Sequence, residues 1–224
     1  MKSVIVTGAN SEIGFSICKF FLEEQYSVIA CVHENVDRIQ TIKNERLKIK
    51  NLDLTNEEEI ASFGYKADII VNVAAYYYDD YYQNIEKKDF MKTLEVNVVA
   101  PFLTFKHLLK DNGMVINISS TDGIDTYNDI NITYSASKAA LNNLTKSLAY
   151  ANSDVKVYAL ALEWVNTELV RSINQDYLND EMNRTGQEKL VEINQITDEI
   201  KNILDDKYIS GSIIRIEGDK DGNK

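Results

Sequence analysis

The sequence predicts an α/β fold in which a doubly wound parallel sheet of about seven strands carries helices on both faces. The first supporting observation is that short, almost continuous apolar runs alternate with amphipathic helical patterns along the chain. The second is that no linker, internal repeat or change of composition divides the 224 residues. We therefore expect a single domain over residues 1–224, with the last six residues, 219–224, frayed.

Seven apolar runs have the length of buried strands, and we expect strands at residues 3–8, 27–32, 47–54, 67–75, 113–120, 154–162 and 210–218. Between them, apolar residues at helical spacing predict helices at residues 11–25, 35–45, 55–63, 87–109, 133–149 and 188–206. The helix at 55–63 is expected to start with a threonine cap, Thr55, followed by acidic residues. Pro101, the only proline, lies within the helix at 87–109 and predicts a kink or a break there.

Composition and charge argue against several classes of protein. The net charge is −11 and no basic cluster occurs, so a nucleic-acid partner is not expected. The first apolar run is too short for a signal peptide and no later run reaches membrane-spanning length, which indicates a cytoplasmic protein with no membrane segment. Cys18 and Cys31 stand among apolar neighbours and are expected to be buried free thiols. The only histidines, His33 and His107, are too far apart for a metal-ligand motif, so no metal site is expected.

In a doubly wound sheet, ligands bind beyond the carboxyl ends of the strands. The first expected strand ends in "TGANSEIG", the fourth in "NVAA" and the fifth in "ISS". The helix after the fifth strand begins with Tyr134 and Lys138, which lie one turn apart on the same face. A Tyr-x-x-x-Lys pair arises about once by chance in a chain with this many tyrosines and lysines. The Tyr134–Lys138 pair is therefore evidence for a functional site only together with the strand-end segments expected beside it.

Taken together and in this order, these segments resemble the short-chain dehydrogenase/reductase family, in its compact single-domain branch, over about residues 2–218. The matches are Thr7, Gly8 and Gly14 in the glycine turn, Asp53 after the third strand, residues 72–75 after the fourth, Asn97 in the long helix, and Ser120 with Tyr134 and Lys138. The resemblance implies a Rossmann-type fold and an NAD(P)-dependent oxidoreductase that interconverts a ketone and a secondary alcohol by hydride transfer.

Four residues are the expected catalytic set: Ser120, Tyr134, Lys138 and Asn97. Tyr134 would donate a proton in reduction and accept one in oxidation, and the Lys138 ammonium is expected to lower the phenol pKa from about 10. Ser120 would donate a hydrogen bond to the substrate carbonyl oxygen. The resemblance implies that Lys138 also holds the cofactor ribose and that Asn97 supports a water in a proton relay. Two simpler interpretations stay open. Ser120 could be an ordinary serine in a strand-to-loop turn, and Asn97 could bond the backbone of a bent helix.

The first helix offers its N-terminus to a phosphate, since its first backbone N–H groups are unpaired and its dipole is positive there. Gly8 would allow the sharp turn, and Gly14 the close packing of helix on sheet. The full set of expected cofactor-binding residues is Thr7, Gly8, Asn10, Ser11, Glu12, Ile13, Gly14, His33, Asp53, Leu54, Asn72, Ala74, Tyr134, Lys138 and Thr167. Asp53 and Thr167 could instead cap the helices that follow them.

The sequence departs from the family pattern at several backbone positions. Glu12 stands where the family has a glycine, Val73 and Ala75 replace an asparagine and a glycine, and residues 162–163 are Leu-Glu in place of Pro-Gly. We expect Glu12 to point into solvent, because a carboxylate facing the pyrophosphate would repel it. The departures keep a second hypothesis open, that of a catalytically impaired protein with a cofactor-binding or regulatory role.

Cofactor and partners follow from the same comparison. An NAD-type site has an acidic residue at the end of the second strand, where this chain has Val32. His33 and Arg38 nearby favour NADP over NAD, although Glu34 opposes them. The expected partners are a small carbonyl or alcohol substrate and, because the helix carrying Asn97 is apolar on more than one side and the family pairs such helices, further copies in a homodimer or homotetramer.

Overall fold

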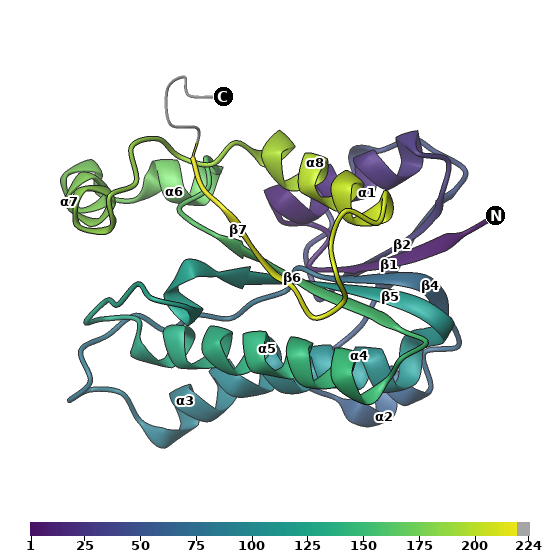
Figure 1. Cartoon of the computed structure of the whole chain (residues 1–224), viewed down its shortest axis with the longest axis horizontal. Helices are drawn as coiled ribbons and strands as arrows, with labels where there is room; N and C mark the ends of the chain where they lie inside the picture. The colour runs from purple at the N-terminus through teal and green to yellow at the C-terminus, as the bar shows by residue number, and fades with distance from the viewer. Residues whose placement is uncertain (219–224) are drawn as a thin grey trace.

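In the computed structural model, which describes residues 1–218, seven parallel strands form one sheet in the order β3-β2-β1-β4-β5-β6-β7 (Figure 1). The strands are β1 (Ser3–Thr7), β2 (Ser27–Val32), β3 (Leu47–Asn51), β4 (Ala67–Asn72), β5 (Leu109–Ser120), β6 (Lys156–Leu162) and β7 (Ile213–Ile216). The expected doubly wound sheet is confirmed. The strand order reverses between β1 and β4, so the crevice for a ligand lies at their carboxyl ends. The expected frayed segment, 219–224, lies outside the described residues.

Helices cover both faces of this sheet (Figure 1). One face carries α1 (Glu12–Glu23) and α8 (Ile193–Leu204), and the other carries α2 (Glu57–Ala61), α3 (Lys87–Leu94), α4 (Ala100–Leu108) and α5 (Ile132–Ala151). Two short helices, α6 (Glu168–Ser172) and α7 (Gln175–Thr185), follow β6 at one end of the sheet. The buried apolar residues form two clusters, one with Ile17, Phe21 and Ile200, the other with Ile70 and Leu103. The sheet separates them.

Three helix predictions need correction. The helix expected at 35–45 is only a 3-10 turn, η1 (Ile39–Thr41), because the Asn10 amide oxygen accepts the backbone N–H groups of Arg38 and Ile39. The helix expected to start at 188 starts at Ile193, because Val191 pairs with Val165 in a parallel bridge. Asn56 caps α2 instead of the expected threonine.

Pro101 breaks its helix as expected, by way of a π-helical turn, η2 (Glu95–Val99), between α3 and α4. Proline has no backbone N–H and its ring crowds the carbonyl group four residues earlier. The Ala100 N–H bonds the Glu95 carbonyl, five residues back, which is the π-helical pattern. The turn places Asn97, with an exposed fraction of 1%, toward the carboxyl ends of the strands.

Both cysteines are buried and free, as expected. Burial raises the pKa of the Cys31 thiol to about 12 and also raises the pKa of Cys18. Within residues 1–218, no helix combines the length and apolar character that crossing a membrane requires, and no three His, Cys, Asp or Glu side chains gather as metal ligands.

A chain of buried polar side chains joins the two central strands to the helices beneath them. The Asn72 amide donates to Asn117 Oδ1 (2.9 Å), and the Asn117 amide donates to Thr145 Oγ1 (2.9 Å). Thr104 Oγ1 donates to Asn72 Oδ1 (3.0 Å). Each of the four side chains is at most 4% exposed, so their hydrogen bonds replace lost contacts with water.

The Asn117→Ala variant should lower the free energy of unfolding by about 1–3 kcal/mol, since it leaves the Asn72 amide and the Thr145 hydroxyl buried without this partner. Urea unfolding followed by circular dichroism measures the loss. The control Asn194→Ala, at an exposed helical position, should change stability by less than about 0.5 kcal/mol. Equal losses in both variants would contradict a stabilising role for the network.

Candidate active site

The turn after β1 is built for close backbone contact. Gly8 has a φ of +61°, and a Cβ there would lie 2.7 Å from the backbone nitrogen of Ala74. A Cβ on Gly14 would lie 2.3 Å from the Gly8 carbonyl oxygen. Ser11 caps α1, since its hydroxyl accepts the Gly14 N–H (3.0 Å). Glycine is therefore required at both positions, the first for the turn and the second for the packing of α1.

The turn is bonded to the segment that follows β4. Thr7 Oγ1 accepts the backbone N–H groups of Val73 (3.1 Å) and Ala74 (3.3 Å). The next residue but one, Tyr76, exchanges two hydrogen bonds with the Asn97 side chain, which accepts from its N–H (2.7 Å) and donates to its carbonyl (2.8 Å). Asn97 also donates to Ser137 Oγ on α5 (2.9 Å). Four of the predicted segments therefore meet at one edge of the sheet.

Ser120, Tyr134 and Lys138 lie together at this edge. Ser120 ends β5, and its hydroxyl is within hydrogen-bonding reach of the Tyr134 phenol and accepts the Asp122 N–H (3.1 Å). The Lys138 ammonium lies 5.3 Å from the centre of the Tyr134 ring and donates to the Ile118 carbonyl (2.8 Å). Lys138 is only 2% exposed, and burial lowers its pKa to about 8.

The expected lowering of the Tyr134 pKa is wrong for this structure. Burial raises the pKa of the phenol first, and the Asp122 and Asp79 carboxylates raise it further, while the hydrogen bond with Ser120 lowers it. Burial penalises the phenolate because a charge loses its hydration there. The result is a phenol that holds its proton, next to a lysine whose own charge is also disfavoured by burial.

Asp79 and Asp122 are site residues that sequence reasoning missed. Asp122 directly follows the end of β5, and Asp79 lies in the tyrosine-rich segment after β4, whose Asp80 N–H bonds the Ile130 carbonyl (2.8 Å) just before α5. Desolvation and the Asp122 charge raise the pKa of Asp79. Only their positions could have indicated a role in the site, because residues that follow the fourth and fifth strands lie at the same edge of the sheet.

Side chains of several other predicted cofactor residues are already engaged. Asp53 accepts the Thr55 N–H (2.9 Å) and hydroxyl (2.7 Å), which lowers the pKa of its carboxyl, so it does not cap α2. Thr167 caps α6 by accepting the Val170 N–H (3.3 Å). Asn10 holds the loop before η1, and Asn72 belongs to the buried network described above. Contacts of these residues with a cofactor therefore remain a prediction.

Glu12 does not point into solvent as expected. Its carboxylate accepts the backbone N–H of Glu168 at the start of α6 (2.7 Å) and lies 3.5 Å from the Arg171 guanidinium. The Glu12 side chain is 22% exposed. Arg38 also reaches α6, where it pairs with the Glu168 carboxylate (2.5 Å). His33, in contrast, is exposed to solvent. No local pattern predicts these contacts, because the partners are far apart along the chain.

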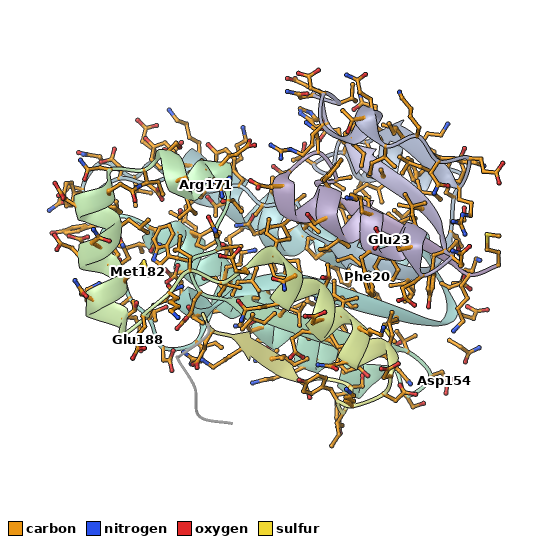
Figure 2. All side chains as sticks on the ribbon, turned by 90° about the horizontal axis from the view of Figure 1, so that it is seen from above. Phe20, Glu23, Asp154, Arg171, Met182 and Glu188 are labelled. Atoms are coloured by element: carbon orange, nitrogen blue, oxygen red, sulfur yellow. The ribbon has the colours of Figure 1, made fainter. Side chains whose placement is uncertain are left out.

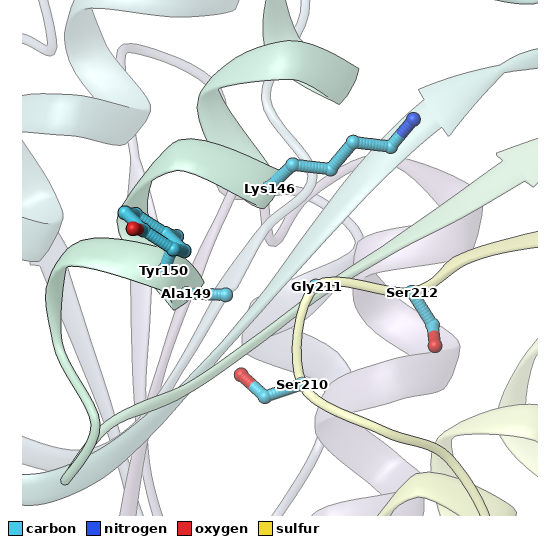
Figure 3. A pocket seen from close by; sticks show the side chains of 6 residues that line it. All are labelled: Lys146, Ala149, Tyr150, Ser210, Gly211 and Ser212. Carbon is cyan, nitrogen blue, oxygen red and sulfur yellow. The ribbon is translucent and has the colours of Figure 1, made fainter.

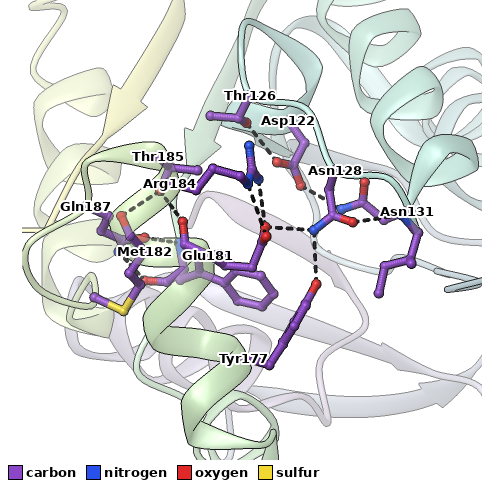
Figure 4. A network of polar contacts seen from close by, with 12 residues as sticks. Asp122, Thr126, Asn128, Asn131, Tyr177, Glu181, Met182, Arg184, Thr185 and Gln187 are labelled. Atoms are coloured by element: carbon purple, nitrogen blue, oxygen red, sulfur yellow. Dashed lines mark hydrogen bonds and ion pairs between the residues drawn. The ribbon is translucent and has the colours of Figure 1, made fainter.

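The loop between β5 and α5 is tied to α7 (Figure 4). The Asn128 amide donates to the Tyr177 hydroxyl (3.0 Å) and to the Glu181 carboxylate (2.7 Å). Arg184 pairs with Glu181, which lowers the pKa of that carboxyl. In the same loop, Asp122 accepts hydrogen bonds from Thr126 and Asn131. The loop that carries Asp122, a neighbour of Tyr134, is therefore held in place by α7 and by its own side chains.

A surface hollow lies elsewhere, toward the other end of α5 (Figure 3). It is lined by Lys146, Ala149, Tyr150, Ser210, Gly211 and Ser212. The lining offers two serine hydroxyls and a lysine, and none of the predicted catalytic or cofactor residues belongs to it. The predicted site and this hollow are thus separate features.

The turn after β1 fits the pyrophosphate of a dinucleotide. Within residues 1–218 no hydrogen bond uses the backbone N–H groups of Glu12 or Ile13, so the N-terminus of α1 has free donors for phosphate oxygens. This turn lies at the switch point of a doubly wound sheet, and hydrogen bonds of Thr7 and Asn97 link it to the helix that carries Tyr134 and Lys138. Such a combination defines a dinucleotide-binding oxidoreductase.

Comparison with known proteins identifies the family. The family model for short chain dehydrogenases matches residues 2–178, and the chain belongs to this family of NAD(P)-dependent oxidoreductases. Nodulation protein G of Rhizobium sp. strain N33 is 30% identical over 194 residues, which cover 80% of this chain and 77% of that protein. The 3-oxoacyl-acyl-carrier-protein reductase of Rickettsia prowazekii strain Madrid E is 29% identical over 187 residues, covering 78% and 77%.

Among solved structures, a 4-hydroxyisoleucine dehydrogenase complexed with NADH is similar over 100% of both chains, with a TM-score of 0.84 and 26% sequence identity. The Rossmann-type fold of the family is therefore shown both by sequence and by structure. The family resemblance inferred from the five sequence segments is confirmed.

Stability should depend on pH through Lys138. Its pKa is about 8 in the folded protein and 10.5 ordinarily, so between these values the unfolded chain binds more protons and stability rises with pH. The rise should reach up to about 3 kcal/mol, and Lys138→Met should abolish it. Urea unfolding at pH 7.5 and about two pH units higher measures the difference, with the exposed Lys146→Met on the same helix as control. An identical pH slope in both variants would contradict the buried ammonium.

Proposed function

We propose that the protein interconverts a ketone and a secondary alcohol by NAD(P)-dependent hydride transfer, with Tyr134 as the acid or base. The observation that carries the proposal is the convergence of Ser120, Tyr134 and Lys138 beside the glycine turn, at the carboxyl ends of β1, β4 and β5. Family membership supports an oxidoreductase, and the intact set of three favours turnover over the impaired alternative.

In this mechanism the reduced nicotinamide, when bound, supplies hydride to the carbonyl carbon. Ser120 donates a hydrogen bond to the carbonyl oxygen as negative charge develops there. Tyr134 transfers its phenolic proton to the same oxygen. Lys138, held by the Ile118 carbonyl, keeps a positive charge near the phenolate that forms. It would also hold the ribose of a bound cofactor, as the family resemblance implies. The raised pKa of Tyr134 suits the reductive direction, since the phenol starts protonated.

The substrate is proposed to be a small or polar carbonyl compound. Two relatives are named for a 3-oxoacyl-acyl-carrier-protein and for 4-hydroxyisoleucine, which contain a ketone and a secondary alcohol respectively. The segment after β6 that would cover the substrate is short and mostly hydrophilic. Acyl-thioester, sugar-linked and simple polar ketones all match this description, and a panel of these three classes with the wild-type protein is the direct test.

Tyr134→Phe should reduce turnover at least about 100-fold, because only the proton donor is lost. Affinity for the cofactor should stay within about threefold, since the ring shape is kept. Turnover is measured by the absorbance of NADPH and affinity by its fluorescence. The control Tyr150→Phe, on the same helix and 94% exposed, should match the wild type. More than a tenth of wild-type turnover in Tyr134→Phe would rule out this residue as the proton donor.

For the cofactor we propose a preference for NADP over NAD. Val32 leaves no carboxylate at the end of β2, and Arg38 can reach a 2′-phosphate if it leaves Glu168. Titration with both reduced cofactors should give a smaller Kd for NADPH, and Arg38→Leu should weaken NADPH binding by about tenfold, the worth of a charged hydrogen bond. A tenfold preference of the wild type for NADH would contradict the proposal and make Glu34 the residue to test.

We propose a cytoplasmic homodimer or homotetramer. The outer side of η2 and α4 exposes apolar residues, with Val99 45% and Phe102 41% exposed, which supports a partner copy on this side. The buried free thiols suit a reducing compartment. Light scattering at tens of micromolar should give a multiple of the 25.5 kDa chain mass, and Phe102→Glu should shift the population toward monomer. A monomeric wild type at this concentration would refute the assembly.

A further inference from the structure

Four charged side chains from three separate segments meet above the glycine turn. Glu12 belongs to α1, Arg38 to the loop before η1, and Glu168 and Arg171 to α6. The Glu12 carboxylate accepts the Glu168 N–H (2.7 Å) and lies 3.5 Å from Arg171, and Arg38 pairs with the Glu168 carboxylate (2.5 Å). Figure 2 shows α6, with Arg171 labelled, beside the beginning of α1.

The two anchoring residues, Glu12 and Arg38, lie at two points along the path that a dinucleotide would take. Glu12 is in the turn whose backbone N–H groups face the pyrophosphate, and Arg38 follows β2, whose end faces the adenosine ribose. The helix α6 comes from the other half of the sheet, after β6. Ion pairs from both anchors to α6 therefore cross the groove.

We propose that Glu12, Arg38, Glu168 and Arg171 form a clasp that closes α6 over the dinucleotide groove and opens each time the cofactor enters or leaves. The proposal rests on the proposed placement of the cofactor in the turn after β1. In this view Glu12, which replaces a glycine, is a positioning residue for the cover of the groove. It does not act on the phosphates.

The cover depends on the clasp because α6 has little stability of its own. It has only five residues, too few for a helix to persist without outside contacts. Its starting N–H groups are bonded by Thr167 and by the Glu12 carboxylate, and Arg171 in turn donates to the Asn166 carbonyl and side chain. Removing the Glu12 charge weakens an N-terminal cap, since a neutral oxygen accepts the Glu168 N–H less strongly, and it deletes an ion pair with Arg171.

Exposed ion pairs are individually weak and sensitive to salt. Weak pairs suit the clasp, because it must open each time the cofactor enters or leaves. No group of the cofactor takes part in these ion pairs. Weakening the pairs should therefore let α6 open faster both in the empty protein and in the protein with cofactor bound. The kinetic signature is thus a rise in both the association and the dissociation rate constants, with little change in Kd.

The test is stopped-flow fluorescence of NADH binding to the full-length protein, with the wild type, Glu12→Gln and Glu168→Gln. NADH is the probe because it has no 2′-phosphate that would draw Arg38 away from Glu168. Both variants should show association and dissociation rate constants about three- to tenfold higher than the wild type, and a Kd within about threefold. Raising the ionic strength tenfold should accelerate the wild type more than either variant. The control is Glu23→Gln, an exposed carboxylate at the far end of α1, which should match the wild type (Figure 2). Thermal unfolding confirms that each variant is folded, and Arg171→Met replaces any variant that is not.

Three outcomes would overturn the clasp. Unchanged rate constants would show that the contacts do not limit exchange. Slower dissociation with a smaller Kd in Glu12→Gln would show that the carboxylate opposes the phosphates. Faster dissociation with unchanged association would make Glu12 a contact of the bound cofactor only. Failure of the proposed reaction is seen separately, as a wild type that binds NADH with these kinetics but turns over no ketone with either reduced cofactor. A wild type that binds neither NADPH nor NADH would overturn both proposals.

Discussion

The close approach of two backbone segments, at Gly8 and Ala74, determines how the rest of the site is arranged. A side chain at Gly8 would lie 2.7 Å from the Ala74 nitrogen, so the turn after β1 and the segment after β4 can meet only without one. Thr7 then bonds that segment, and Asn97 bonds it again two residues later. Through Asn97 and Ser137 the contact reaches α5, which carries the phenol and the ammonium.

Polar side chains under the site hold these parts in register. The bonds among Asn72, Asn117 and Thr145 join neighbouring strands to α5 through side chains that could not be buried singly without loss. An apolar set of similar volume would fill the same space, but it would not specify which strand residue faces which helix residue. The position of Ser120, three residues beyond Asn117 on β5, therefore depends on this network as well as on the sheet itself.

Most of the fold could be predicted because its signals are local. The sequence pattern predicts all seven strands, since a buried parallel strand needs only an apolar run bounded by turns. The segments at the strand ends indicate the place of the site. The misses share one physical cause, which is that a distant partner decides the outcome. Asn10 bonds the segment where a helix was expected, and Glu12 contacts α6, 156 residues away. Burial by the folded chain, which no local pattern reports, raises the pKa of Tyr134, and the Asp122 charge raises it further, although Lys138 was expected to lower it.

The π-helical turn at Glu95–Val99 has a consequence for insertions and deletions in this part of the chain. A π turn holds one more residue than an α turn, and each residue of an α-helix advances the side-chain direction by about 100°. Deleting one residue upstream of Asn97 would remove the extra residue by which the helix passes Pro101, and would rotate the Asn97 amide away from Tyr76 and Ser137. The length of this segment is thus constrained as strictly as its composition, and changes in chain length should be tolerated in the loops on either side rather than here.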